Sequence, residues 1–179
     1  IKDILDEKDP RVRAKNTDVD FPLNDEYKDI IPEMLKHLRY SQIEKLSKKY
    51  DLRPGMGLAA PQLGINKNFF VVCYEVKDGV FDDYILINPK VISYSEEMIY
   101  AGEGEGCLSV NREVEGIVPR HARITVEAYD LDGNKRKYRV REDLAIAFQH
   151  ELDHLNGILF VDYIDPKDPY KNADLYREI

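Results

Sequence analysis

The sequence predicts an α+β fold, with antiparallel sheets packed around one central helix and additional helices near the N-terminus. Apolar residues at helical spacing occupy residues 24–50, strand-like runs fill 69–140, and a second helical pattern covers 142–156. Strands grouped together, without the strand–helix alternation of a parallel sheet, are typical of this class. With 179 residues, of which 43% are hydrophobic, the chain is expected to form a single domain over 1–179.

The N-terminal third is expected to be helical after a polar, extended segment of about twenty residues. Asn24 suits the N-cap of a helix through Arg39 or beyond. Its apolar residues recur every three or four positions (Ile30, Ile31, Met34, Leu35, Leu38). Pro32 is expected to kink this helix or to lie near a break. A second short helix is expected over 41–50.

The middle of the chain reads as strands. Residues 69–76, 84–88 and 91–95 are β-branched or aromatic runs separated by Gly, Asp and Pro. Residues 123–129 alternate with period two, and the Asp-Gly pair at 132–133 then turns the chain back, which predicts a β-hairpin with 135–140 as its second strand.

The last long helix is expected over 142–156, with Gly157 directly after it in the C′ position. Glu142 and Asp143 suit the positive end of the helix dipole. One stripe of the helix is apolar and is expected to face the core (Leu144, Phe148, Leu152, Leu155). A second stripe carries Ile146, His150 and His154, flanked by Ala147, so the histidines are expected away from the buried stripe.

This helix contains a His-Glu-x-x-His motif. Residues four apart share a helix face, so His150 and His154 can direct two imidazoles at one metal ion. Glu151 would then lie within reach of whatever the ion binds. The pattern predicts a metal-binding helix and a metal-activated water with a carboxylate that manages protons. The alternative for Glu151 is a solvated helix residue.

A catalytic metal usually takes three protein ligands, so a third is needed. One class of protease would place a third His at the position of Phe160, and another would need a downstream Glu, for which only Glu178 remains. Cys107, next to the glycine-rich residues 102–106, is the better candidate. A thiolate with two imidazoles suits zinc or ferrous iron without choosing between them. Cys73, in contrast, reads as a small buried residue.

A third segment, 55–62, combines glycines with Gln62. The glycines permit close backbone approach, and strand-like N–H and C=O groups there could pair with an extended peptide. Gln62 offers an uncharged amide donor of the kind that stabilises a developing oxyanion. A purely structural Gly/Ala-rich turn is the alternative.

The three segments together resemble the signatures of peptide deformylase: G-x-G-x-A-A-x-Q at 55–62, E-G-C-x-S at 105–109 and Q-H-E-x-D-H at 149–154. The resemblance is expected to run from about residue 20 to 165. The run from Cys107 to Arg112 and the long N-terminal region look more like the type II bacterial branch. It implies a metal-dependent hydrolase that removes the N-formyl group from the N-terminal formyl-methionine of new polypeptides. The products would be formate and a free amino terminus.

The resemblance also implies roles for single residues. One divalent ion, ferrous iron physiologically and zinc or nickel in purified protein, would be held by three side chains (Cys107, His150 and His154). Gln62 and the Leu108 backbone N–H would stabilise the charge on the carbonyl oxygen, and Glu151 would carry the proton to the departing amine. A methionine pocket would be lined by Ile146, Ala147 and His150. The backbone of the substrate would pair with Met56, Gly57 and Leu58.

The remaining candidates stay open. Asp153 either orients a ligand imidazole or faces solvent. Glu105 is expected to anchor the glycine loop through hydrogen bonds. His37 and His121 are expected at the surface or in loops, without a role.

Composition limits the partners. A net charge of −8 argues against a general nucleic-acid binder and against DNA, although a small basic patch is compatible with it. No run approaches the roughly 20 apolar residues of a membrane span, and two cysteines form no disulfide framework, so a cytoplasmic location is expected. A monomer is expected as well. The expected partners are formyl-methionyl peptides and nascent chains, with transient ribosome proximity. The tail 165–179 holds three positive and four negative residues and gives no support for a basic docking helix.

Three rival functions remain for comparison. A peptidase that cuts internal bonds lacks its third His, and a silent binding relative should have lost Glu151, Gln62 or a ligand. A structural zinc domain would need a fourth ligand, for which Cys73 is the only spare cysteine.

Overall fold

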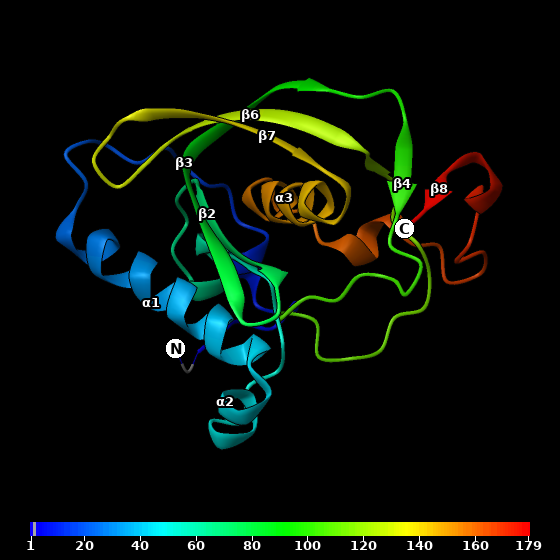
Figure 1. The fold of residues 1–179 in the computed structure, drawn as a ribbon, viewed down its shortest axis with the longest axis horizontal. Helices are drawn as coiled ribbons and strands as arrows, with labels where there is room; N and C mark the ends of the chain where they lie inside the picture. The colour runs from blue at the N-terminus through cyan, green and yellow to red at the C-terminus, as the bar shows by residue number, and fades with distance from the viewer. Residues whose placement is uncertain (2) are drawn as a thin grey trace.

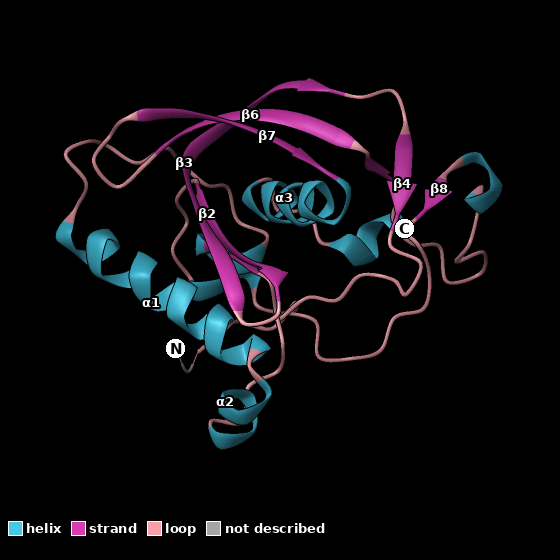
Figure 2. Cartoon of the chain, viewed as in Figure 1, coloured by secondary structure: helices cyan, strands magenta, loops and turns pink. Residues whose placement is uncertain are grey.

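A computed structural model describes residue 1 and residues 3–179 (Figures 1 and 2). The helices are η1 Pro10–Val12, α1 Asp25–Gln42, α2 Glu44–Lys49, η2 Ala60–Leu63, α3 Glu142–Leu155, η3 Phe160–Tyr163 and η4 Ala173–Leu175. The strands are β1 Gly57–Ala59, β2 Phe69–Lys77, β3 Val80–Tyr94, β4 Met98–Tyr100, β5 Arg120–His121, β6 Arg123–Tyr129, β7 Lys135–Arg141 and β8 Arg177–Glu178. None of the described helices is long and apolar enough to cross a membrane.

The strands form two sheets. The larger has five strands in the order β1-β2-β3-β6-β7, and every pairing in it is antiparallel. The smaller has the order β5-β4-β8 and is mixed, because β8 runs parallel to β4. The prediction of antiparallel sheets therefore holds except at β8. Figure 1 shows the large sheet arching over α3, with the small sheet near one end of that helix.

Two cores flank the large sheet, and β2 contributes to both. Phe70 and Val72 point to the side of α3, where the Phe70 and Phe148 rings meet edge to face at 5.7 Å. Phe69 and Val71 point to the opposite side, where α1 packs. A strand buried on both faces is apolar at every position, which explains the continuous apolar run in this part of the sequence. The α+β architecture around a central helix is confirmed.

The two strands expected at 84–88 and 91–95 are one long strand, β3. Asn88 adopts a left-handed conformation with φ 50°, and its side chain exchanges hydrogen bonds with the backbone of Val19. The pairing with β6 shifts register between Ile87 and Lys90. The Asn-Pro pair at 88–89 therefore makes an irregularity inside a strand rather than a strand end.

Other expectations about the N-terminal third need correction. The first twenty residues are not simply extended, since they contain η1 and bury Val12 and Val19. Asn24 caps α1 as expected by accepting a hydrogen bond from Glu26 N, and the helix extends beyond Arg39 to Gln42, with Pro32 inside it.

The two histidines without a motif are also not simple surface residues. His37 is buried in α1, and burial lowers its pKa. His121 lies in β5, with Nδ1 2.7 Å from the carbonyl oxygen of Ser95.

Candidate metal centre

The end of α3 fixes the two motif histidines. Gly157 has φ 72°, a left-handed value that Gly adopts without the strain of a Cβ. Its N–H donates to His154 O, and the next N–H, of Ile158, donates to Asp153 O. These two bonds form a Schellman motif that satisfies carbonyls in the last turn, so the predicted C′ glycine is confirmed. His154 lies inside this closed turn, and His150 lies one turn before it.

The histidines are buried, contrary to the expectation that their stripe would be open. His150 is 9% exposed and His154 is 1% exposed. The ring of Phe160 stacks on His150 with a centroid distance of 5.9 Å. The stripe is buried because the segments around Cys107 and η3 cover the face of α3 that the sheet leaves free.

Cys107 completes a metal-ligand set. Its Sγ lies 3.3 Å from His154 Nε2, and one possible ligand atom from each of three residues lies within 4.8 Å of the others (Cys107, His150, His154). This is the only such group among the residues that the structure describes. A thiolate and two imidazoles fit zinc or ferrous iron and leave a coordination position open.

Burial affects the pKa of both imidazoles. It lowers the pKa of His154 well below the ordinary value, with the charge of His150 adding to the effect. For His150 the hydrogen bonds of Cys107 and Glu105 outweigh burial and raise the pKa. A neutral imidazole is the form that ligates, so metal binding must displace the proton that this environment favours on His150.

Residues 102–109, which carry Cys107, are called the ligand loop here. A buried ion-pair network holds this loop against α3. Glu105, two residues before Cys107, accepts a hydrogen bond from His150 Nδ1 at 2.9 Å. The guanidinium of Arg120, 3% exposed, donates to both Glu105 oxygens at 2.9 Å and also to Asp153. The hydroxyl of Tyr163 donates to the same Asp153 at 2.8 Å. Glu105 thus orients the His150 ring, as carboxylates behind metal ligands do. Asp153 contacts Arg120 and Tyr163 rather than an imidazole, and His154 Nδ1 has no hydrogen-bond partner among the described residues.

Burial alone would raise the pKa of Glu105, but the hydrogen bonds from His150 and Arg120 and the charge of Arg120 lower it to about 2. Burial alone would lower the pKa of Arg120, and its two carboxylate partners raise it instead. Both groups are therefore charged across the whole physiological pH range.

Glu151 lies in a different environment. It is 3% exposed, and its Oε1 accepts no hydrogen bond from any described residue. Its Oε2 lies 4.0 Å from His150 Nε2. Burial raises the pKa of this carboxyl to about 7. A Cβ on Gly57 would lie 2.5 Å from Glu151 Oε2, so only glycine fits there. A buried carboxyl that can gain or lose a proton near neutral pH is suited to proton transfer.

Gln62 lies on the other side of the ligand loop. Its Oε1 accepts from Ala59 N at 2.9 Å, which fixes the side-chain amide. Its Nε2 donates to Ser109 Oγ at 3.0 Å and lies 3.7 Å from Cys107 Sγ. The amide donor is therefore held beside the sulfur ligand, and Ser109 is a buried partner that the motif did not reveal.

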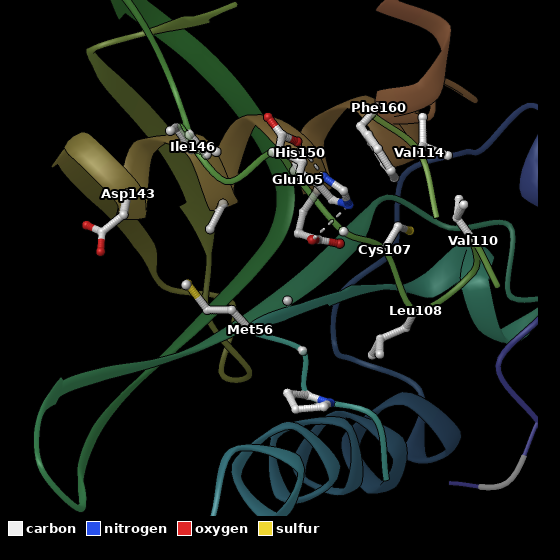
Figure 3. Close-up of a pocket in the computed structure, with 18 of the residues that line it drawn as sticks. Met56, Glu105, Cys107, Leu108, Val110, Val114, Asp143, Ile146, His150 and Phe160 are labelled. Atoms are coloured by element: carbon white, nitrogen blue, oxygen red, sulfur yellow. Dashed lines mark hydrogen bonds and ion pairs between the residues drawn. The ribbon is translucent and has the colours of Figure 1, made fainter. Parts of the chain in front are cut away.

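A cavity of about 940 Å³ opens beside these residues. Its lining includes every residue expected to contact the substrate except Leu58 and the donor Gln62 (Met56, Gly57, Ile146, Ala147, with Cys107, Leu108, His150 and Glu151). Figure 3 shows Met56, Ile146 and Asp143 at one end and Cys107 with Phe160 at the other. The Leu58 side chain is not part of the lining, because it is fully buried in the core under α1. The cavity has the volume of a small-molecule site, and Met56, Ile146 and Ala147 give it apolar walls of the kind that such sites have.

β1 borders this cavity and forms an edge of the large sheet. It pairs with β2 on one side only. Its other edge pairs with no described strand, although the Ala59 N–H is taken by Gln62 Oε1. The rest of that edge can pair with an extended chain.

Sequence reasoning missed two supporting residues, Arg120 and Ser109. Glu105 gave an indirect signal for the arginine, since a carboxylate beside a metal ligand needs a cation when it is buried. Nothing in the spacing pointed to Arg120, 15 residues downstream in β5. Ser109 is the last residue of its motif, and its link to Gln62 joins two motifs.

The central helix with two ligating histidines, the cysteine loop and the adjacent cavity define a metal-dependent hydrolase. Comparison with known proteins gives the family: the family described as "Polypeptide deformylase" matches residues 1–170. The chain belongs to the peptide deformylase family, whose enzymes remove the N-formyl group from the amino terminus of polypeptides. The match begins earlier than the expected residue 20, because the N-terminal segment is part of the fold.

Bacterial relatives and solved structures agree. The chain is 49% identical to a peptide deformylase of Macrococcus caseolyticus over 172 residues, covering 96% of this chain and 94% of that protein. It is 45% identical to "Peptide deformylase 2" of Bacillus anthracis, covering 97% and 95%. The crystal structure of peptide deformylase from Thermotoga maritima aligns with a TM-score of 0.70 at 33% identity, covering 91% of this chain and 97% of that one.

Proposed function

We propose that this deformylase uses Glu151 as its proton carrier, with Gln62 and Leu108 as donors to the formyl oxygen. The observation that carries the proposal is the buried Glu151 carboxyl, which has an oxygen without a described partner and a pKa raised to about 7. A group poised near neutral pH can take a proton in one step and return it in the next.

Cys107, His150 and His154 would hold one divalent ion, for which we propose ferrous iron physiologically, with zinc or nickel as ions that the same donors accept. When bound, the ion supplies a Lewis acid that activates water at neutral pH. Glu151 takes the proton released as water attacks the formyl carbon. It then delivers that proton to the amine nitrogen as the C–N bond breaks, so formate and a free amino terminus leave.

Charge on the formyl oxygen needs donors that are already in position. The Gln62 amide is fixed by Ala59 and Ser109, and the Leu108 N–H directly follows the sulfur ligand. Fixed donors of this kind are worth about a hundredfold or more in rate, because they need no reorganisation.

The proposed substrate contacts combine an apolar pocket with a backbone edge. The methionine side chain would lie against Met56, Ile146 and Ala147, next to His150. The peptide backbone would pair with β1, at Met56, Gly57 and Leu58, of which Leu58 contributes main chain only. Because this pairing uses only main-chain hydrogen bonds of the substrate, the enzyme would accept many different residues after the methionine.

The proposed setting is a cytoplasmic monomer with one domain over 1–179, of the type II bacterial branch. Its substrates would be nascent chains that begin with formyl-methionine, met close to the ribosome.

The first experiment is anaerobic turnover of formyl-Met-Ala by ferrous-loaded protein, measured as formate release. Glu151→Gln keeps the size of the side chain and removes its proton-carrying group. We expect a loss of about 10²-fold or more in kcat at equal metal content. The matched control is Glu113→Gln, an exposed carboxylate in the same cavity lining, which should keep full activity. Equal turnover by the parent and Glu151→Gln would refute the proton-carrier role.

A further inference from the structure

The outer face of the β6–β7 hairpin concentrates positive charge in an otherwise acidic chain. Alternate residues of β7 point to opposite sides: Tyr138 and Val140 pack against the core of α3. The four residues between and beside them are exposed and basic (Lys135, Lys137, Arg139, Arg141). Arg123 of β6 pairs directly with Arg141 in the register and adds a fifth cation on the same face.

Carboxylates neutralise only part of this charge. Glu127 binds Lys135 at 3.1 Å and lies 4.0 Å from Lys137. Glu97 binds Arg123 at 3.0 Å but is shared with Arg177. Among the described residues, Arg139 and Arg141 make no ion pair.

The two unpaired arginines border a hollow. A cavity of about 380 Å³ lies over adjacent positions of three strands, β3, β6 and β7. Its lining includes three arginines, two serines and one threonine (Arg123, Arg139, Arg141, Ser93, Ser95, Thr125). We refer to these six residues as the arginine groove. Arginine guanidinium groups and side-chain hydroxyls commonly contact phosphate oxygens in nucleic-acid complexes.

We propose that the arginine groove binds the phosphate backbone of an RNA strand. Outward positions along a strand repeat about every 7 Å, so Arg139 and Arg141 can contact neighbouring phosphates of one chain. A net charge of −8 disfavours polyanions on the molecule as a whole, so RNA is expected only at a local cluster of positive charge such as this one. The choice of RNA as the polyanion rests on the proposed function, because new polypeptides are made beside RNA.

The arginine groove and the substrate cavity lie on different sides of α3. The inner face of β6 and β7 packs on that helix, and Figure 1 shows both strands arching over it with their outer face turned away. The cavity contains His150 and Glu151 of α3 together with the ligand loop. RNA in the groove therefore leaves the cavity open to a peptide.

The test is fluorescence anisotropy of a labelled 20-nucleotide single-stranded RNA titrated with metal-loaded enzyme at about 50 mM salt. The groove variant is Arg139→Glu/Arg141→Glu. The matched control is Lys28→Glu/Lys45→Glu, which makes the same change in net charge at exposed lysines of α1 and α2. We expect the Kd of the groove variant to be about tenfold higher. The slope of log K against log salt concentration should be less steep by about 1.4, the value for two phosphates of a single strand.

Four outcomes would overturn the proposal. The parent enzyme could fail to bind the RNA, which would leave the basic residues as protection of the edge strand β7 against pairing. The control could weaken binding as much as the groove variant, which would make the effect one of net charge. Arg139→Lys/Arg141→Lys, which keeps the charge, could bind as weakly as the glutamate variant. Finally, a DNA strand of the same sequence could bind more tightly than the RNA.

Turnover of formyl-Met-Ala separates this proposal from the catalytic one. Both charge-reversal variants should release formate at the parental rate, because neither changes the cavity. Binding is measured without turnover, so failure of the RNA proposal and failure of the proton-carrier proposal give different results.

Discussion

At the level of single residues, Arg120 holds the metal centre together without touching it. Its guanidinium is almost fully buried and joins Glu105, on the ligand loop, to Asp153, on α3. Removing this cation leaves the buried Glu105 carboxylate, 5% exposed, without the arginine that neutralises it.

Arg120→Gln should lower the free energy of unfolding by about 3–5 kcal/mol. Metal affinity should fall about 10- to 100-fold, because Glu105 then no longer holds the His150 ring in place. Urea unfolding of the metal-loaded protein and competition with a chelator measure the two effects. Arg123→Gln, which removes an exposed pair with Glu97, is the control and should cost less than about 1 kcal/mol. Similar losses from both variants would mean that the network contributes no more than a surface ion pair.

Glu105 should also make stability depend on pH. Its pKa falls from 4.5 to about 2 in the folded protein. The folded state therefore binds this proton less readily than the unfolded state, so the stabilisation is complete above about pH 4.5 and is lost as pH falls toward 2. In metal-free protein, Glu105→Gln should flatten the decline in unfolding free energy between about pH 4.5 and 2, the window set by the two pKa values. An unchanged slope would show that other carboxylates control the acid transition.

The spacing of residues on one helix made part of the site predictable. His150, Glu151 and His154 follow from four-residue periodicity, and Cys107 followed from its glycines and from the need for a third ligand. Burial was not predictable in the same way. The segments that cover the histidines come from residues 102–116 and 158–164, and only the folded chain brings them over α3.

At the level of elements, the end of α3 depends on Gly157. A Cβ there would lie 2.9 Å from the carbonyl oxygen of Arg13, in addition to the strain of φ 72°. Gly157→Ala should therefore cost more than about 2 kcal/mol, and it should weaken metal binding through His154. Gly133→Ala is a matched control with φ 83°, where the nearest atom is a flexible ring carbon of Phe21 at 3.2 Å. Urea unfolding of both variants separates strain alone from strain plus a backbone clash, and equal costs would exclude the clash.

Long elements were predictable and short ones were not. β2, β6, β7 and α3 carry enough residues to show a period, and their expected bounds agree with the structure within a few residues. β1, β4, β5 and β8 have two or three residues each, which is too few for any pattern. They form because longer elements bring their backbones together. The Asn-Pro pair inside β3 misled the prediction because it has the sequence of a strand end and the structure of a bulge.

At the level of the whole molecule, the N-terminal segment joins two of the sequence motifs. Leu5 N donates to Gln62 O at 2.8 Å, and Glu7 N donates to Ser109 O at 2.7 Å. The side chain of Glu7 also binds Arg112. A segment that precedes the expected start of the resemblance, at about residue 20, thus contacts both the Gln62 motif and the Cys107 motif.

Glu7→Pro should therefore affect the site more than Glu7→Ala. Both remove the ion pair with Arg112, but only proline removes the N–H that Ser109 accepts. The alanine variant should lose less than about 1 kcal/mol of stability, and the proline variant about 1–3 kcal/mol more, with slower formate release. Unfolding in urea and turnover of formyl-Met-Ala test this. Indistinguishable variants would assign the whole effect to the ion pair.

The short edge strand β1 has a consequence for solubility during protein synthesis. An open edge beside an apolar cavity is a place where any unfolded chain can add a strand and seed aggregation. β1 has three residues, Gly57–Ala59, and turns at once into η2, so its free edge offers about 10 Å of backbone. In the proposed binding mode that length would seat the first residues of a peptide, but it is too short to template a long ladder between chains.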